Sequence, residues 1–228
     1  MIAVISDIHG NLWALQAVLQ DLDRFGPSQV IVAGDLALGG PRPAECVELI
    51  RRRGYPAIRG NTDEWLTSAP DSITDAIGWA ATQLSDADRR YLAGLPFLWR
   101  IPHGAGDLVV VHATPWSISD VVPPDAPEPV VRRVFADTAA AAVAYGHIHI
   151  AYVRELGDKL LVNPGSVGLP FDGDQRASYA TLSVEGDRWR AALRRVQYDT
   201  AAAVEALRSS GNPEAERFAR RLEQASAR

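Results

Sequence analysis

The sequence predicts an α/β fold with a parallel sheet at its amino-terminal end. Short apolar runs alternate with segments of helical periodicity between residues 2 and 58, in the order strand, helix, strand, helix, strand. The length of 228 residues, with 47% hydrophobic and 22% charged residues, suits a single globular domain over residues 1–228. We expect this domain to close with two helices at about residues 200–226.

The amino-terminal elements follow from apolar spacing. Residues 12–25 place Leu15, Val18 and Leu22 three or four positions apart, which is typical of a helix with one buried face. Pro43 suits the first turn of a second helix. The expected elements are strands at 2–6, 29–33 and 55–58, and helices at 12–25 and 43–53.

The remaining elements alternate in the same way. Residues 71–95 show helical periodicity, and Ser85 and Asp86 form an expected cap before a second helix. A proline-rich loop is expected at 122–129. Strands are expected at 97–101, 107–111, 141–145, 151–156, 159–162, 178–184 and 188–196, and helices at 130–135, 200–209 and 213–225.

Composition excludes several classes of protein. The net charge of −5 argues against non-specific nucleic-acid binding, which requires a basic surface. Cys46 is the only cysteine, so no intrachain disulfide is possible, and a reducing compartment fits. No apolar run is long enough to cross a membrane, and the start MIAVISDIHG lacks the basic region of a signal peptide. We expect a cytoplasmic protein.

Five short polar motifs follow strand-like runs. They lie at residues 6–11 (SDIHGN), 33–35 (AGD), 59–63 (RGNTD), 111–114 (VHAT) and 146–149 (GHIH). Ligands of open α/β sheets bind beyond the carboxyl ends of the strands, where these motifs fall. Four of the five histidines lie in them, and the fifth, His103, is expected in a surface turn without a role. Each motif alone is a weak signal, but the five in this order indicate a metal site.

In this order the motifs resemble those of the calcineurin-like metallophosphoesterase superfamily. Its pattern is D-x-H, GD, GN-H-D/E, a histidine after an apolar strand, and GHxH. The resemblance extends from residue 2 to about residue 196, and residues 163–166 (NPGS) and 176–179 (RASY) are similar to the small prokaryotic phosphodiesterase branch. It implies a four-layer α/β-β/α sandwich of two mixed β-sheets flanked by helices, with metals between the sheets.

The resemblance also implies the roles of individual residues at a centre with two divalent metals. One metal would be bound by Asp7, His9 and His149, the other by Asn61, His112 and His147, with Asp35 bridging the two. The same matching makes Asp35, Asn61, His112 and Asn11 the catalytic residues. It places Asn11 and the loop at 163–166 near the phosphate.

The chemistry of this ligand set limits the metal. Carboxylate, amide and imidazole ligands without a thiolate suit Mn²⁺, Fe²⁺, Zn²⁺, Co²⁺ or Ni²⁺ and argue against a pure Mg²⁺ or Ca²⁺ site. Two such ions clamp the attacking and leaving oxygens of a phosphodiester. We expect attack by a metal-bridging hydroxide, since coordination brings the pKa of water towards ~7.

Thr62 departs from the family pattern, in which many members have a histidine able to protonate the leaving oxygen. Threonine is not a useful general acid at neutral pH. The enzyme then acts on substrates with good leaving groups or through another acid, or it has lost turnover and keeps its metals as a scaffold. We favour the first, because every expected ligand is present. Asp63 either orients its turn or is an exposed cap.

The leading interpretation is a phosphodiesterase acting on small or nucleotide-like substrates. One alternative is a phosphomonoesterase, including protein or dinucleoside-polyphosphate phosphatases, which needs more positive charge; Arg59 is the only motif-flanking candidate. Another is a non-catalytic, metal-bound interaction scaffold whose terminal helices bind a partner or a second copy in a homo-oligomer. We expect those helices to pack on their own domain. Trp65, Trp79 and Trp116 are expected in the core rather than on a substrate face.

Overall fold

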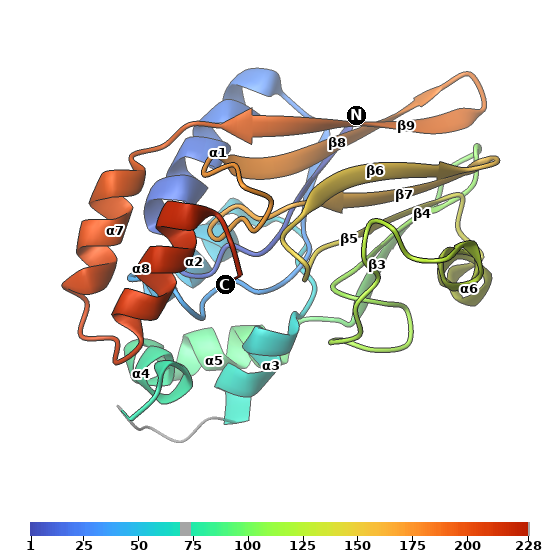
Figure 1. Cartoon of the computed structure of the whole chain (residues 1–228). Helices are drawn as coiled ribbons and strands as arrows, with labels where there is room; N and C mark the ends of the chain where they lie inside the picture. Colours follow the sequence, from blue (N-terminus) through green and yellow to red (C-terminus); the bar gives the residue numbers. More distant parts are fainter. Residues whose placement is uncertain (69–73, 228) are drawn as a thin grey trace.

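Two mixed β-sheets face each other in the structure, which is a computed structural model describing residues 1–68 and 74–227 (Figure 1). One sheet has four strands in the order β2-β1-β8-β9, and the other has five in the order β3-β4-β5-β7-β6. The strands are β1 (Ile2–Ile5), β2 (Gln29–Val32), β3 (Leu98–Ile101), β4 (Leu108–Val111), β5 (Ala142–Tyr145), β6 (Ala151–Leu156), β7 (Lys159–Pro164), β8 (Ala177–Glu185) and β9 (Arg188–Val196).

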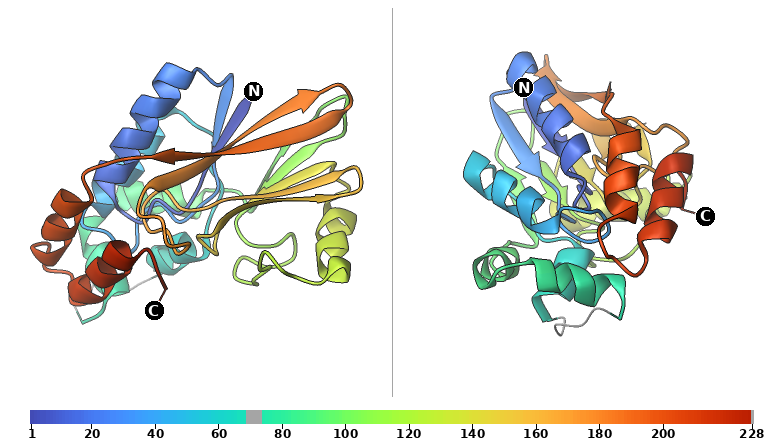
Figure 2. Two further views of the ribbon diagram at one scale, coloured as in Figure 1. Left: turned by 45° about the horizontal axis from the view of Figure 1, so that its top comes forward. Right: turned by 90° about the vertical axis from the view of Figure 1, so that its left-hand side faces the viewer.

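The helices found in the described residues lie outside this pair of sheets. They are α1 (Leu12–Phe25), α2 (Pro43–Arg53), α3 (Asn61–Ser68), α4 (Ala76–Gln83), α5 (Asp86–Ala93), α6 (Glu128–Thr138), α7 (Thr200–Arg208) and α8 (Ala215–Gln224). Helices α1 and α6 lie on opposite sides of the sheets (Figures 1 and 2).

Each sheet contains a parallel pair of strands that precede motifs, and in the second sheet β5 is also parallel to β7. Strand β1 is parallel to β2, and β4 is parallel to β5, whereas β8 runs antiparallel to β1. The carboxyl ends of β1 and β2 therefore meet at one edge of the first sheet, and those of β4 and β5 meet at one edge of the second. The expected parallel sheet is thus part of a mixed one.

Alternation of buried side chains builds the four layers. In β1, Val4 packs between the two sheets, while Ala3 and Ile5 pack towards α1. In β4, Val110 packs between the sheets and Val109 towards α6. Strands buried on both faces are continuous apolar runs, which is the pattern seen in the sequence. The four-layer α/β-β/α sandwich of two mixed sheets is confirmed.

Helix α1 begins and ends as its sequence dictates. The Asn11 side chain accepts a hydrogen bond from the Ala14 amide at the start. Gly26 ends the helix in the left-handed region at φ 68°. This cap fixes the direction in which the chain leaves the first motif.

The prediction of a third strand at residues 55–58 is wrong. Ala57 forms a single parallel bridge with β2, and no strand follows. Pro56 has no amide hydrogen to donate, and the Arg59 amide turns away to the Pro96 carbonyl. The chain therefore leaves the sheet edge and enters α3, a helix that the sequence pattern did not predict.

The expected helical region at 71–95 contains two helices, α4 and α5. Residues 71–73 lie outside the described residues. Ser85 caps α5 as expected, and it forms a reciprocal capping box with Asp88. Helices α3, α4 and α5 lie together below the ends of the strands in Figure 1.

The two terminal helices agree with the expected positions within two residues. Their apolar faces pack on the domain, where Val204, Leu207, Phe218 and Leu222 join the core around α1. Within residues 1–68 and 74–227, no helix has both the length and the apolar character needed to span a membrane.

Candidate metal centre

Loops at the strand ends bring the five motifs to one place between the sheets. Asp7 and His9 follow β1, Asp35 follows β2, His112 follows β4, and Asn61 begins α3. Backbone hydrogen bonds continue the pairing of β1 with β2 beyond the strand ends. The Asp7 amide donates to the Gly34 carbonyl and the His9 amide to the Asp35 carbonyl, both at 3.0 Å. His147 and His149 follow β5.

The backbone at this site is strained. Seven non-glycine residues among the described residues have positive φ, and two of them, Ala139 and Ala225, are helix ends. The other five are expected ligands, with φ between 49° and 68°: Asp7, His9, Asp35, His147 and His149. The left-handed region is unfavourable for such residues, by about 1–3 kcal/mol each. Because five of these strained residues lie at one place, the backbone itself marks this place as a functional site.

Two glycines allow the loops to cross closely. A Cβ on Gly60 would lie 2.1 Å from Asp35 Oδ1, and a Cβ on Gly146 would lie 2.5 Å from Asp7 Oδ2. Both positions therefore exclude side chains, because a carboxylate occupies the space and, at Gly146, Ser6 Oγ also lies 2.0 Å from the added Cβ. The close packing of these loops therefore explains the glycines of the GN and GH motifs.

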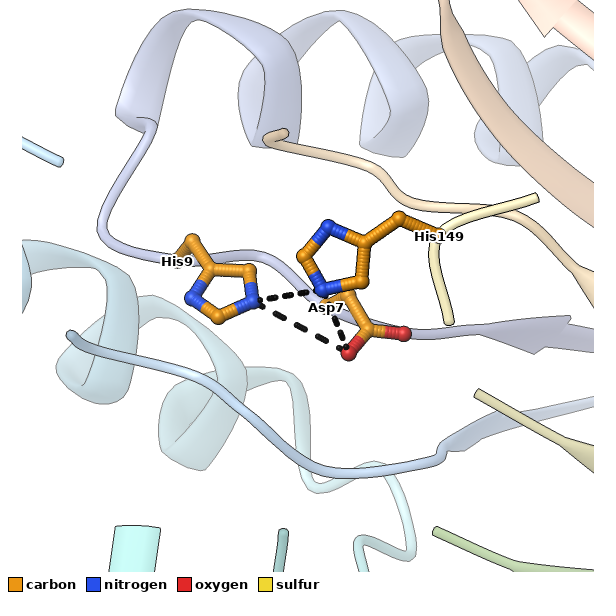
Figure 3. A group of neighbouring side chains, drawn as sticks. All are labelled: Asp7, His9 and His149. Carbon is orange, nitrogen blue, oxygen red and sulfur yellow. Dashed lines mark hydrogen bonds and ion pairs between the residues drawn. The ribbon is translucent and has the colours of Figure 1, made fainter. Parts of the chain in front are cut away.

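Asp7, His9 and His149 form one group of potential ligands (Figure 3). Their donor atoms point at one another: Nε2 of His149 lies 3.3 Å and Nε2 of His9 lies 3.9 Å from Asp7 Oδ1. The two imidazole nitrogens are 3.0 Å apart. All three side chains are buried.

Backbone carbonyls determine the tautomers of these histidines. Nδ1 of His9 lies 2.6 Å from the Leu38 carbonyl, and Nδ1 of His149 lies 2.5 Å from the Leu169 carbonyl. A carbonyl oxygen only accepts, so each Nδ1 donates and each neutral ring presents an Nε2 lone pair to the site. His112 repeats this arrangement through the Ala33 carbonyl at 2.7 Å.

This geometry fits a metal cation. The Nε2 lone pairs of His9 and His149 face each other, and both face the Asp7 carboxylate, with no donor among the three. Such a buried cluster of acceptors is costly unless a cation or a proton neutralises it. The donor set of imidazole and carboxylate is that of a divalent transition metal.

Asp35 lies between His9 on one side and His112 on the other. Its Oδ2 is 3.6 Å from His9 Nε2, and its Oδ1 is 3.5 Å from His112 Nε2. Asp7, Asp35 and His112 form a second group of potential ligands. Asn61 joins it, since its Oδ1 lies 2.9 Å from His112 Nε2.

His147 is oriented differently from the other three histidines. Its Nε2 lies 3.0 Å from the Ser119 carbonyl, so Nε2 donates and Nδ1 holds the free lone pair. Its backbone amide donates to the Asp7 carboxylate, and its ring centroid is 5.2 Å from that of His112. The ring is next to the site, but it belongs to neither group of converging ligand atoms.

Asn11 and the loop at 163–166 support the site from behind. The Asn11 side chain caps α1 through Oδ1 and donates through Nδ2 to the Gly168 carbonyl at 2.9 Å. Ser166 Oγ donates to the Asp7 carbonyl, and Asn163 Nδ2 donates to the Gly146 carbonyl, both at 2.7 Å. These contacts tether the ligand-bearing loops, and they occupy the polar atoms of Asn11.

Asp63 orients the turn that carries Asn61, and it is fully buried rather than an exposed cap. Its carboxylate accepts from the amides of Asp35, Leu36 and Gly60 at 2.8–2.9 Å. Burial and the nearby charge of Asp35 raise the pKa of Asp63 to about 7. The amide bonds, which favour the ionised form, oppose this shift.

The titration of the site reflects its crowded charges. Burial alone would raise the pKa of Asp7, but the charge and hydrogen bond of the protonated form of His149 bring it below its usual value of 3.8. Burial and His149 lower the pKa of His9. Burial opposes protonation of His112, yet Asp35 and Asp7 raise its pKa above 6.5.

A cleft of about 420 Å³ opens onto these residues. Thr62 lines it, and the Thr62 hydroxyl is buried without a hydrogen-bond partner in the described residues. Trp65 also lines the cleft and is 46% exposed, so its expected core position is wrong. Trp79 is buried in the core as expected, and Trp116 is half-buried. The substrate face that the sequence left as the alternative is thus the position of Trp65, which lies on the helix α3 that the apolar spacing did not predict.

The fold and the site together define a family. The sequence model of the calcineurin-like phosphoesterase superfamily domain matches residues 1–187, and the protein belongs to this superfamily. The chain is therefore a metal-dependent phosphoesterase, a hydrolase that acts on phosphate esters.

Individual relatives agree with this assignment. The chain is 33% identical to the "Uncharacterized protein MJ0912" of Methanocaldococcus jannaschii over 94% of each chain. It is 26% identical to phosphodiesterase YfcE of Escherichia coli strain K12, over 78% of this chain and 84% of that one. The crystal structure of a metallophosphoesterase from Sphaerobacter thermophilus superposes with a TM-score of 0.82 at 30% identity, covering 98% of each chain.

Gly60→Ala is expected to weaken metal binding by at least about tenfold. The new Cβ would lie 2.1 Å from Asp35 Oδ1 and would displace that carboxylate. Gly104→Ala is the matched control, because nothing lies within 4 Å of its added Cβ. Titration of both metal-free variants with Mn²⁺ measures the difference, and equal affinities would contradict the proposed position of Asp35.

Metal affinity is expected to rise with pH through the neutral range. His112 must be neutral to bind a metal, and its raised pKa means that a proton competes above pH 6.5. Below about pH 7, protonation of Asp63 should lower metal affinity further, because its carboxylate orients the turn that carries Asn61. The affinity should fall about tenfold per pH unit below these pKa values and level off above them. Calorimetry in buffers of different ionisation enthalpy should detect proton release, and a flat affinity between about pH 6 and pH 8 would refute this linkage.

Proposed function

We propose that the protein is a binuclear phosphodiesterase acting on small or nucleotide-like phosphodiesters. The observation that supports two metals is the position of Asp35, whose two carboxylate oxygens face imidazoles of different ligand groups. A carboxylate in this position is suited to bridging. Divalent cations held here would supply Lewis-acid activation of the phosphate and of a water nucleophile.

In this proposal each metal has three ligands besides Asp35. Asp7, His9 and His149 hold the first, and the close approach of their donor atoms supports this set. The second is held by Asn61, His112 and His147, with Nδ1 of His147 as the ligand atom because its Nε2 donates to Ser119. Backbone carbonyls behind His9, His112 and His149 keep the Nε2 lone pairs directed at the site.

The charge around the centre favours a monoanionic diester over a dianionic monoester. Arg59, the expected motif-flanking cation, lies 3.4 Å from Glu64 and does not line the cleft. The cleft residues adjoining the ligands are the uncharged Thr62, Leu38 and Leu169. The cationic side chains of the cleft, Arg217 and Arg221, lie on α8, and the Phe171 ring stands between Arg221 and His149. Within the described residues, no arginine or lysine forms an ion pair with Asp7 or Asp35, so the second charge of a dianion would have no cationic side chain in contact with the ligands.

Thr62 supports activity on substrates with good leaving groups. Its amide donates to Asp35 Oδ1 at 2.9 Å, which holds the hydroxyl beside the bridging position. The unpartnered hydroxyl is available to hydrogen-bond a substrate oxygen, but it does not act as an acid at neutral pH. Asn11 acts in this proposal through the loops that it tethers.

The remaining features of the proposal concern the metal and the setting. Imidazole-rich ligands and the absence of thiolate support Mn²⁺ or another first-row divalent ion. Cys46, the single cysteine, is buried, which agrees with a reducing cytoplasm. Residues 1–228 act as one domain in this proposal, because α8 lines the cleft.

The function is tested with a panel of aryl esters on the Mn²⁺-reconstituted protein. Bis-p-nitrophenyl phosphate should be hydrolysed faster than p-nitrophenyl phosphate. Asp35→Asn should reduce diester turnover by at least about 10³-fold, since it removes the bridging charge. Glu64→Gln, on the exposed side of α3, is the control and should retain activity. Full metal-dependent turnover by Asp35→Asn would overturn the assignment.

Substitutions at Thr62 should separate hydrogen bonding from acid catalysis. Thr62→Ala should change turnover of the activated aryl diester by less than about tenfold, the value of one neutral hydrogen bond. Thr62→His should speed hydrolysis of a dialkyl diester, whose alkoxide is a poor leaving group, because general-acid help is worth about 10²–10⁴-fold. A loss above about 10³-fold in Thr62→Ala would show that the hydroxyl has a larger role.

A further inference from the structure

The far wall of the cleft comes from outside the part of the chain that matches the family. The family match ends at residue 187, whereas α8 contributes Arg217, Phe218 and Arg221 to the cleft that contains His9 and His149. Helix α8 lies against α7 at the end of the molecule where the motif loops lie (Figures 1 and 2). This wall therefore comes from residues beyond those that the family model matches.

Arg221 is an uncompensated cation in this wall. Arg217 pairs with Glu214 at 2.5 Å, so these two charges cancel. Arg220, the neighbouring arginine, pairs with Glu216 at 3.0 Å on the outer face of α8. For Arg221, no carboxylate of residues 1–68 or 74–227 lies within ion-pair distance. The cleft wall thus presents one net positive charge.

The Arg221 guanidinium is close to the metal centre. Its Cζ lies 5.9 Å from the centroid of the Phe171 ring, and Phe171 stacks on His149 with centroids 4.4 Å apart and an interplanar angle of 15°. One aromatic ring therefore separates the cation from an expected metal ligand. Burial, and the charge of Arg217 that Glu214 only partly offsets, lower the pKa of Arg221, and an anion beside the guanidinium would oppose this shift.

The other walls suit an aromatic group. Trp65 lies on α3 with 46% of its surface exposed, and Ile77 of α4 lies in the same cleft. A cleft of about 420 Å³ is within the range of sites that hold small organic ligands. Exposed tryptophan rings stack on flat aromatic groups such as nucleobases.

We propose that Arg221 is a specificity-determining residue that binds a second anionic group of the substrate, so that the preferred substrate is a nucleotide phosphodiester carrying an additional phosphate. The scissile phosphate lies at the metal ligands, the second phosphate pairs with the guanidinium beyond Phe171, and the base contacts Trp65. This proposal rests on the proposed phosphodiesterase function. Its alternative is that Arg221 and Phe171 only brace His149.

The test compares two chromogenic substrates that differ by one phosphate. Thymidine 5′-(p-nitrophenyl phosphate) and its 3′-phosphorylated counterpart share a leaving group and a nucleoside. The Mn²⁺-reconstituted wild type should show a KM about ten- to one-hundred-fold lower for the 3′-phosphorylated compound, the range expected of a charge-assisted hydrogen bond. Arg221→Gln should abolish this difference with kcat unchanged, and Arg221→Lys should restore part of it. Arg220→Gln is the matched control and should behave as wild type.

Direct binding separates failure of the subsite from failure of the proposed function. Calorimetry with thymidine 3′,5′-bisphosphate and thymidine 5′-phosphate needs no turnover. A wild type that binds the bisphosphate more tightly, and loses that preference in Arg221→Gln, supports the subsite even if neither ester is hydrolysed. No preference in the wild type, or an unchanged preference in Arg221→Gln, overturns it. Equal losses on both substrates with reduced metal content in Arg221→Gln also overturn it, because a brace on His149 would produce them.

Discussion

The structure depends on the convergence of buried acceptors that have no donor among them. Nε2 of His9 and of His149 lie 3.0 Å apart beside the Asp7 carboxylate, and backbone carbonyls prevent either ring from presenting an N–H there in its neutral form. A fold that keeps such atoms together must offset their mutual repulsion with a bound cation or a proton. Left-handed backbone at five of the expected ligands adds strain, which persists because both sheets hold the loops in place.

The sandwich provides that support through its strand ends. Pairs of parallel strands in each sheet end at the same level, and hydrogen bonds between loops extend each pairing to the ligands themselves. Gly60 and Gly146 let the loops touch the carboxylates, and Asp63 ties three amides of two loops together. The site is therefore rigid on the side of the ligands, and its cleft is formed by the helices α3, α4 and α8.

Most of the strands and the position of the site could be predicted from the sequence, for a physical reason. Strands buried on both faces are unbroken apolar runs, so β1, β2, β4 and β5 were found, and the polar residues that end them are the site. The expected strand at 55–58 was wrong because Pro56 and the turn to Pro96 end the pairing after one bridge. The helix α3 was not predicted because a short polar helix has weak periodicity, and the expected core position of Trp65 on that helix was therefore wrong. Arg221 resembles any surface arginine of an amphipathic helix, since only tertiary packing directs it to the cleft.

The most direct measurement of the central claim is the metal content of the protein. Protein freed of metal with a chelator, reconstituted with Mn²⁺ and separated from free ions should retain two metal ions per chain by elemental analysis. Spin coupling between the two ions in electron paramagnetic resonance should show that they share a bridge, as the position of Asp35 requires. Retention of no metal, or of isolated ions without coupling, would contradict the account.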